Sequence, residues 1–150
     1  MNENYSLKAL LQLLATKYFP NTTYIIKDGV ANATFSQIGA SGSGTGTFVK
    51  SGDYMLFTDN ATGTSFYTEI DVTNRTTIYF ECSGVTGNSS GLYGVVGCDV
   101  NSNYNLANSE SIKSTGKVIY SVDVSAMSGI AYIKCCGWGM SFKVYNVWVE

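Results

Sequence analysis

The sequence predicts an all-β protein, a jelly-roll β-sandwich of about ten short antiparallel strands preceded by one N-terminal amphipathic α-helix. Three observations favour this fold. Apolar residues alternate with polar ones at period two through most of the chain after residue 22. Turn residues interrupt the alternation at short intervals, with 16 glycines and a single proline in 150 residues. The segments between these breaks are rich in Tyr, Thr and Val, which fit the pleated surface of a strand.

The first 22 residues follow a helical pattern instead. Leucines recur at helical spacing until Pro20, and Asn4 or Ser6 can cap the start. A helix this short is marginal in water unless its apolar side packs on something. We therefore expect residues 1–22 to form a helical arm that either covers its own domain or docks on neighbouring copies or another protein. The apolar surface of this arm consists of Leu7, Leu10, Leu11, Leu14 and Tyr18.

Residues 23–150 form the predicted sandwich domain. Polar, glycine-rich segments separate its strands, and the longest of them, residues 101–116, is rich in Asn and Ser and is expected to be a mobile loop. Without helices between them, many short strands indicate two packed sheets. The candidate strands are 23–27, 33–38, 47–50, 54–58, 66–72, 76–83, 92–99, 117–124, 130–136 and 141–149.

Composition excludes several classes of function. Only 13% of the residues are charged and the net charge is −2, so no basic surface is expected to attract nucleic acid. The chain has no histidine, which removes His-based triads and the usual zinc sites. No pair of carboxylates is marked out by its surroundings as an acid/base couple. We therefore predict a protein that is not an enzyme and that needs no cofactor.

Metal and membrane binding are also not expected. Asp53, Asp59 and Asn60 are too weak a cluster to hold calcium, and no cysteines have the CxxC spacing of a zinc site. The N-terminal apolar run is too short to span a bilayer and has only two lysines for an in-plane anchor.

The four cysteines are expected to be buried free thiols. No basic opening or small-residue cleavage site of a signal peptide is present near the start, so we expect folding in a reducing cytoplasm. Two of them stand in apolar strand-like runs, where a thiol behaves as a small hydrophobe. The four are Cys82, Cys98, Cys135 and Cys136.

Two passages resemble a known family. "YTEIDVTNRTTIYFECSG" (67–84) is similar to a strand pair joined by an Ile-Asp-Val-Thr-Asn turn, and "YSVDVSAMSGIAYIKCCGWGMSFKVYNVWVE" (120–150) is similar to a closing run that ends in Asn-Val-Trp. Together they resemble the jelly-roll modules, similar to galactose-binding and carbohydrate-binding-module domains, of tailed-bacteriophage virion structural proteins. The resemblance covers about residues 24–150. It implies the fold and a virion source, for a protein made in the host cytoplasm, and it gives no binding residues.

Two functions follow from these observations. The first is a structural component of a phage particle, such as a head decoration, fibre-base or tail-appendage protein. It would form a homo-oligomer such as a trimer and contact other virion proteins through the helical arm. The second is a carbohydrate-binding module that contacts a bacterial surface glycan, which requires a surface aromatic ring and amide groups that read sugar hydroxyls. The candidate glycan contacts are Tyr93, Tyr104, Trp138 and Asn103.

Overall fold

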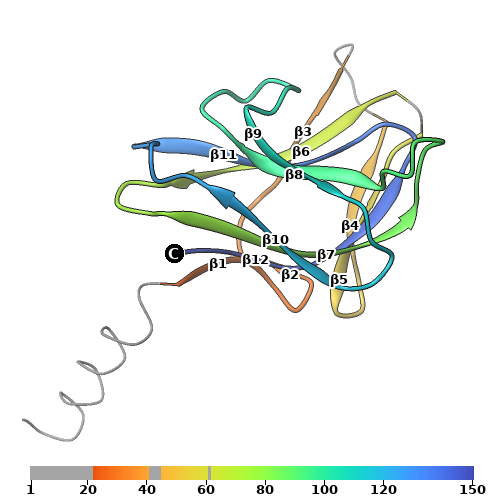
Figure 1. Cartoon of the computed structure of the whole chain (residues 1–150), viewed down its shortest axis with the longest axis horizontal. Helices are drawn as coiled ribbons and strands as arrows, with labels where there is room; N and C mark the ends of the chain where they lie inside the picture. The colour runs from red at the N-terminus through yellow and green to blue at the C-terminus, as the bar shows by residue number, and fades with distance from the viewer. Residues whose placement is uncertain (1–21, 41–44, 61) are drawn as a thin grey trace, which may run out of the picture.

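The described part of the chain, residues 22–40, 45–60 and 62–150 of a computed structural model, is a sandwich of two antiparallel sheets. Figure 1 shows the two sheets as two stacked layers. One layer has seven strands: β1 (Thr23–Lys27), β2 (Val30–Ala31), β4 (Thr47–Ser51), β5 (Tyr54–Thr58), β7 (Thr77–Thr86), β10 (Val118–Asp123) and β12 (Ser141–Val149). The other has five: β3 (Ser36–Gly39), β6 (Thr64–Asp71), β8 (Gly94–Asp99), β9 (Asn108–Ile112) and β11 (Ile130–Gly137).

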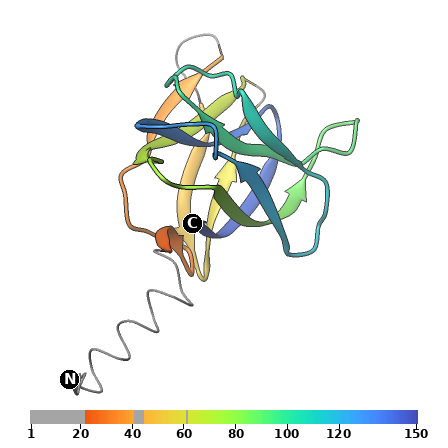
Figure 2. The ribbon, with the colours of Figure 1, turned by 60° about the vertical axis from the view of Figure 1, so that its left-hand side comes forward.

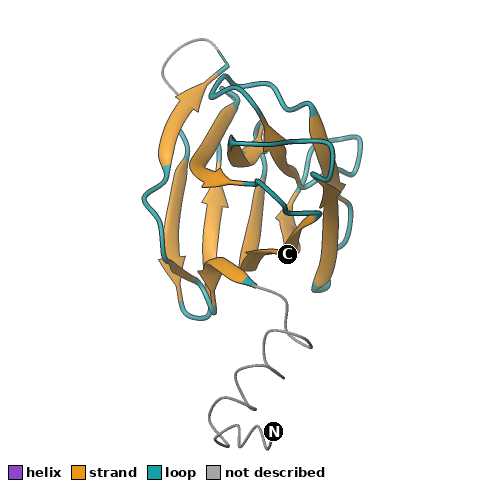
Figure 3. Cartoon of the chain, turned by 90° about the vertical axis from the view of Figure 1, so that its left-hand side faces the viewer, coloured by secondary structure: helices purple, strands orange, loops and turns teal. Residues whose placement is uncertain are grey.

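The predicted fold class needs correction. The described residues form twelve strands rather than about ten, and none of them is helical (Figure 3). The predicted helix, with Leu7, Leu10, Leu11, Leu14 and Tyr18, lies outside the described residues. Ten of the twelve strands coincide with the predicted segments, and the two additional ones are β2 and β9.

Both additional strands are short or polar. β2 follows the turn at Asp28 and Gly29, which both adopt positive φ angles (50° and 69°), as the two central residues of a tight hairpin turn do. β9 lies in the segment that was expected to be a mobile loop. It pairs with β8 along its whole length, but only its last residue, Ile112, is fully buried.

The core lies between the two sheets. Alternate residues of each strand point inward, so that Phe57, Phe80 and Phe142 from the seven-stranded sheet meet Ile133 and Cys135 from the five-stranded sheet. All four cysteines are buried and free. The thiol prediction is therefore in agreement with the structure.

Strand β12 joins the other strand pairs of the seven-stranded sheet. It pairs with β7 along its length, with β5 at residues 141–144 and with β1 at residues 147–149. The strand order is β10-β7-β12-β1-β2, and the β4–β5 pair joins through β5. Figure 2 shows that the turn between β7 and β8 extends away from the two layers. No helix among the described residues is long and apolar enough to cross a membrane.

Candidate functional site

The outer face of the five-stranded sheet carries the candidate site. β6 and β11 are paired at the centre of this sheet, and their inward residues, such as Phe66, Ile133 and Cys135, belong to the core. Because side chains alternate across a strand, the residues between them point to the other side. The outward residues of these two strands, called the outer face below, are Ser65, Tyr67, Glu69, Asp71, Ile130, Tyr132, Lys134 and Cys136.

Trp138 occupies the next outward position beyond the end of β11. The residue is 56% exposed, and among the described residues its ring stacks on no other aromatic ring. It packs beside Gly63, where a Cβ atom would lie 2.8 Å from Trp138 Cε3 and 3.1 Å from the Tyr104 hydroxyl. Gly63 also has a φ of +72°, which favours glycine. Trp138 and Tyr104, two rings predicted from the sequence, therefore meet over one glycine.

Asp59 fixes the turn that carries Trp138. Its carboxylate accepts hydrogen bonds from Gly139 N (2.7 Å), Gly63 N (3.2 Å) and Thr64 Oγ1 (2.7 Å). Burial by itself raises the pKa of Asp59, but these hydrogen bonds outweigh it, so the pKa of this carboxyl lies below its ordinary value. The β5–β6 turn and the β11–β12 turn are thus joined at one buried anion.

Tyr104 and Asn103 lie in the loop between β8 and β9. The main-chain oxygen of Asn103 accepts a hydrogen bond of 2.7 Å from Lys134 Nζ. Tyr104 is half-buried, and its pKa is raised by burial first and then by the neighbouring Cys136 and Asp59. The Tyr104 hydroxyl therefore lies close to the outer face and to the same anion that holds the Trp138 turn.

Tyr93, the fourth residue predicted from the sequence, belongs elsewhere. Its ring covers Gly84, where a Cβ atom would overlap the ring atoms, and it packs against the core. It is therefore a packing residue in this structure. The sandwich brings together three of the four predicted contacts, Trp138, Tyr104 and Asn103.

Two further rings on the outer face were missed by the sequence prediction. Tyr67 and Tyr132 contact each other edge to face, with ring centroids 5.7 Å apart. Beside them is a shallow pocket of about 300 Å³ lined by Thr34, Ser36, Tyr67, Thr68 and Glu69. Tyr132 is six residues before Trp138 on the same side of the chain, about 20 Å away at the usual rise of a strand. The alternation of side chains along residues 64–71 and 130–137 could have shown that Tyr67 and Tyr132 point outward.

The outer side of the seven-stranded sheet carries a different aromatic group. Tyr24, Trp148 and Tyr79 are register neighbours on β1, β12 and β7. Tyr79 and Trp148 stack at 5.0 Å with an interplanar angle of 16°, so each ring covers a face of the other. We interpret this row as a cross-strand packing group, because Tyr79 and Trp148 stack on each other and Tyr24 lies beside Trp148 with ring centroids 6.1 Å apart.

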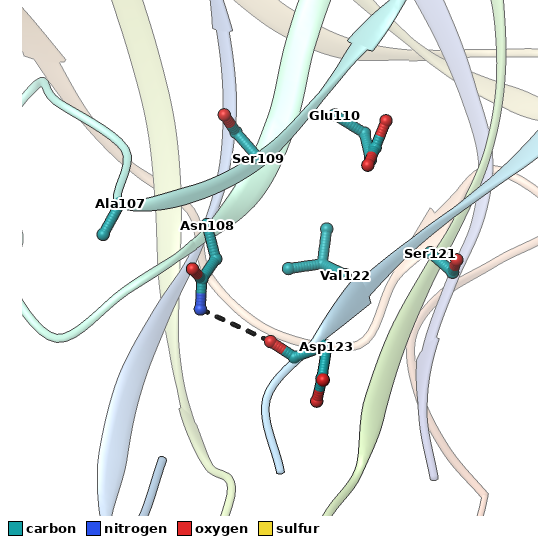
Figure 4. A pocket seen from close by; sticks show the side chains of 7 residues that line it. All are labelled: Ala107, Asn108, Ser109, Glu110, Ser121, Val122 and Asp123. Atoms are coloured by element: carbon teal, nitrogen blue, oxygen red, sulfur yellow. Dashed lines mark hydrogen bonds between the residues drawn. The ribbon is translucent and has the colours of Figure 1, made fainter. Parts of the chain in front are cut away.

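A second pocket, of about 360 Å³, lies between the edge strands β9 and β10 (Figure 4). Asn108 spans it at one end by donating a hydrogen bond to the main-chain oxygen of Asp123 (3.3 Å). Glu110 and Ser121 also line it, and none of its lining residues is aromatic. This pocket therefore lacks the ring surface that a sugar site needs.

Among the described residues there is no group of three or more Cys, Asp or Glu side chains that could hold a metal ion. Asp59, the carboxylate that holds the turn of Trp138, is 6% exposed, and its oxygens accept hydrogen bonds. The arrangement presents aromatic and amide surface, which suits binding.

No protein-family model and no curated protein matches this chain. Its fold is similar to solved structures of family 29 carbohydrate-binding modules. One of these, CBM29_1 from Piromyces equi, is 12% identical with a TM-score of 0.60, and the match covers 86% of this chain and 89% of that chain. A variant of CBM29-2 is 19% identical with a TM-score of 0.55 and coverages of 87% and 91%. Another variant, complexed with cellulohexaose, is 18% identical with a TM-score of 0.56 and coverages of 85% and 89%.

At these identities the likeness shows the fold. The expected resemblance to carbohydrate-binding modules is confirmed at the level of the β-sandwich. None of these structures connects the chain to a bacteriophage particle.

Proposed function

We propose that this protein is a non-catalytic carbohydrate-binding module that binds a neutral polysaccharide at the end of the five-stranded sheet where Trp138 and Tyr104 meet, with these two side chains as its principal contacts. The observation that carries the proposal is Trp138, a residue that is 56% exposed on a turn held by a buried carboxylate. The similarity of the fold to carbohydrate-binding modules supports it.

A fixed, exposed ring suits a sugar for a physical reason. One face of a pyranose ring is lined by C–H groups, and stacking that face on indole removes apolar area from water without leaving hydroxyls unpaired. Because hydrogen bonds to Asp59 hold the turn before a ligand arrives, little conformational entropy is lost on binding. Asn103 and the Tyr104 hydroxyl are the neighbouring polar groups for sugar hydroxyls.

The charges around the two rings favour a neutral ligand. Asp59 and Lys134, which hold the two aromatic turns, are both buried. Neither can pair with a charged sugar without losing its present hydrogen bonds. Toward Tyr132 the exposed charges include the carboxylates of Glu69 and Asp71, which would repel a uronic acid.

The test is binding of purified protein to neutral polysaccharides, such as β-glucan, mannan and xylan, and to a uronic-acid polymer. Affinity electrophoresis and titration calorimetry should show binding to at least one neutral polymer. Trp138→Ala should weaken it by about 30-fold or more, since a central aromatic contact contributes about 2 kcal/mol or more. Trp148→Ala is the matched control, because it removes the same side chain from the opposite sheet and should leave affinity unchanged. Equal affinity of wild type and Trp138→Ala would contradict the proposed site.

The virion role stays a prediction. The comparisons do not test homo-oligomer formation, contacts with other virion proteins or location in a particle. The similarity of the fold to carbohydrate-binding modules favours glycan binding as the function. The absence of catalysis is part of the proposal, and incubation with the bound polysaccharide should release no reducing ends.

A further inference from the structure

Lys134 lies on the outward side of the five-stranded sheet and is nevertheless buried. Its side chain has no exposed surface, because the loop of residues 100–107 lies over it. The ammonium donates hydrogen bonds to the main-chain oxygens of Asn103 and Asn105, both at 2.7 Å. Asn103 Oδ1 is 3.4 Å away and Asp99 Oδ2 is 3.9 Å away. One cation therefore holds the two carbonyl groups that flank Tyr104.

Asp99 completes the arrangement from the end of β8. It is 5% exposed, and its two oxygens accept hydrogen bonds from Asn101 N and Ala107 N, both at 3.1 Å. These two amides lie near the two ends of the loop. The pair of Lys134 and Asp99 thus fixes the loop at its beginning, its middle and its end.

We propose that the buried pair of Lys134 and Asp99 is the positioning element that places Tyr104 beside Trp138, and that glycan affinity depends on it. Only the dependence of glycan affinity on this pair rests on the proposed function; the positioning of Tyr104 does not. The two aromatic contacts then have separate supports. Asp59 holds the turn of Trp138, and the pair of Lys134 and Asp99 holds the loop of Tyr104.

The energetics of buried charges support a positioning role. A buried ion pair is often replaced by apolar residues without loss of stability, because desolvation offsets much of its attraction. The groups that Lys134 satisfies are main-chain carbonyls of a polar loop, which no apolar side chain can bind. An apolar substitute can therefore fill the space under the loop without fixing its conformation.

Gly63 offers a readout that needs no ligand, since both rings lie against it. In the full chain, nuclear Overhauser contacts from the Gly63 α protons should reach the rings of Tyr104 and Trp138. Lys134→Met keeps an unbranched, flexible side chain that is one atom shorter and removes the three donors of the ammonium group. We expect this variant to lose the contact to Tyr104 and to keep the contact to Trp138. Amide exchange at residues 101–107 should rise at least tenfold.

The second measurement is of glycan binding, with the neutral polymer that the wild type binds. Lys134→Met should weaken binding about tenfold, and the effect should shrink to less than twofold when Tyr104 is already replaced by Ala. If Tyr104 stays against Gly63 and exchange is unchanged in Lys134→Met, the positioning inference is wrong. If the ring is released while affinity is unchanged, the link to binding is wrong.

Failure of the proposed function gives a different result. In that case the wild type binds no glycan, and the Gly63 contacts still decide whether the pair positions Tyr104. Should Lys134→Met not fold, Asp99→Asn gives the same comparison, because it weakens the acceptors of the two end amides and keeps the size of the side chain. It should then raise exchange at residues 101 and 107 most.

Discussion

Replacing Asp59 with alanine tests the connection between the two turns of the candidate site. The change removes the acceptor of two main-chain donors, Gly63 N and Gly139 N, and of the Thr64 hydroxyl. A buried donor left without a partner costs about 1–3 kcal/mol, and the hydroxyl can turn to another acceptor. With partial rehydration near the surface, we expect the free energy of unfolding to fall by about 2–4 kcal/mol. For a domain of this size that is a fall in melting temperature of about 6–12 °C.

The assay is urea unfolding followed by circular dichroism, with a thermal melt as a second measurement. Asp123→Ala is the matched control, because its exposed carboxylate accepts a local hydrogen bond from Ser125 N only two residues away. It should cost less than about 1 kcal/mol. A loss below about 0.5 kcal/mol in Asp59→Ala, or equal losses in both variants, would refute the view that Asp59 ties the turns together. Glycan affinity should fall in Asp59→Ala and not in Asp123→Ala.

Three further outcomes are expected. Hydrogen bonds from the residue two positions later lower the pKa values of Asp71 and Asp123. The two carboxylates therefore stabilise the fold above about pH 4, and this stabilisation is lost as pH falls through their folded-state pKa values. In acid titration, the double Ala variant should lose less stability than the wild type. Burial raises the pKa of Cys98 and Cys136 to about 11. Iodoacetamide at pH 8 should therefore label the native protein slowly and should label all four thiols quickly in guanidinium; rapid labelling of the native protein would contradict their burial. Trp148→Ala should lower stability by about 1–3 kcal/mol because its stacked ring is lost, and a neutral effect in urea unfolding would show that the ring row does not stabilise the sheet.

The strand pattern of the fold could be predicted because each strand's period is local. β9 was missed because an edge strand buries one side of a few residues, and of Asn108–Ile112 only Ile112 carries an apolar side chain. β2 had a signal that was not used, since an Asp-Gly pair such as Asp28-Gly29 between two strand-like runs is a strong hairpin indicator. A two-residue strand is nevertheless too short for any periodicity to show.

The candidate site could be predicted only in part. Tyr104 and Trp138 were singled out as aromatic residues in or near loops, but their meeting over Gly63 depends on three turns far apart in the sequence. Tyr93 has the same local character as Tyr104 and is packed against the core instead, because Gly84 on another strand leaves room for its ring. The interior position of Lys134 also has no local signal, since the carbonyls that surround it come from a loop 29–31 residues away.

The pairing of β12 has a consequence for synthesis on the ribosome. Without residues 141–149, the seven-stranded sheet reduces to three separate pairs, β1–β2, β4–β5 and β7–β10, which have no strand in common. Isolated two-stranded hairpins are marginal in water. The five-stranded sheet needs no part of β12, so its backbone pairing can be complete in a nascent chain that has reached Gly137. Such a chain would expose the inward side of that sheet, with Phe66 and Ile133, to chaperones until β12 emerges and the second layer assembles around it.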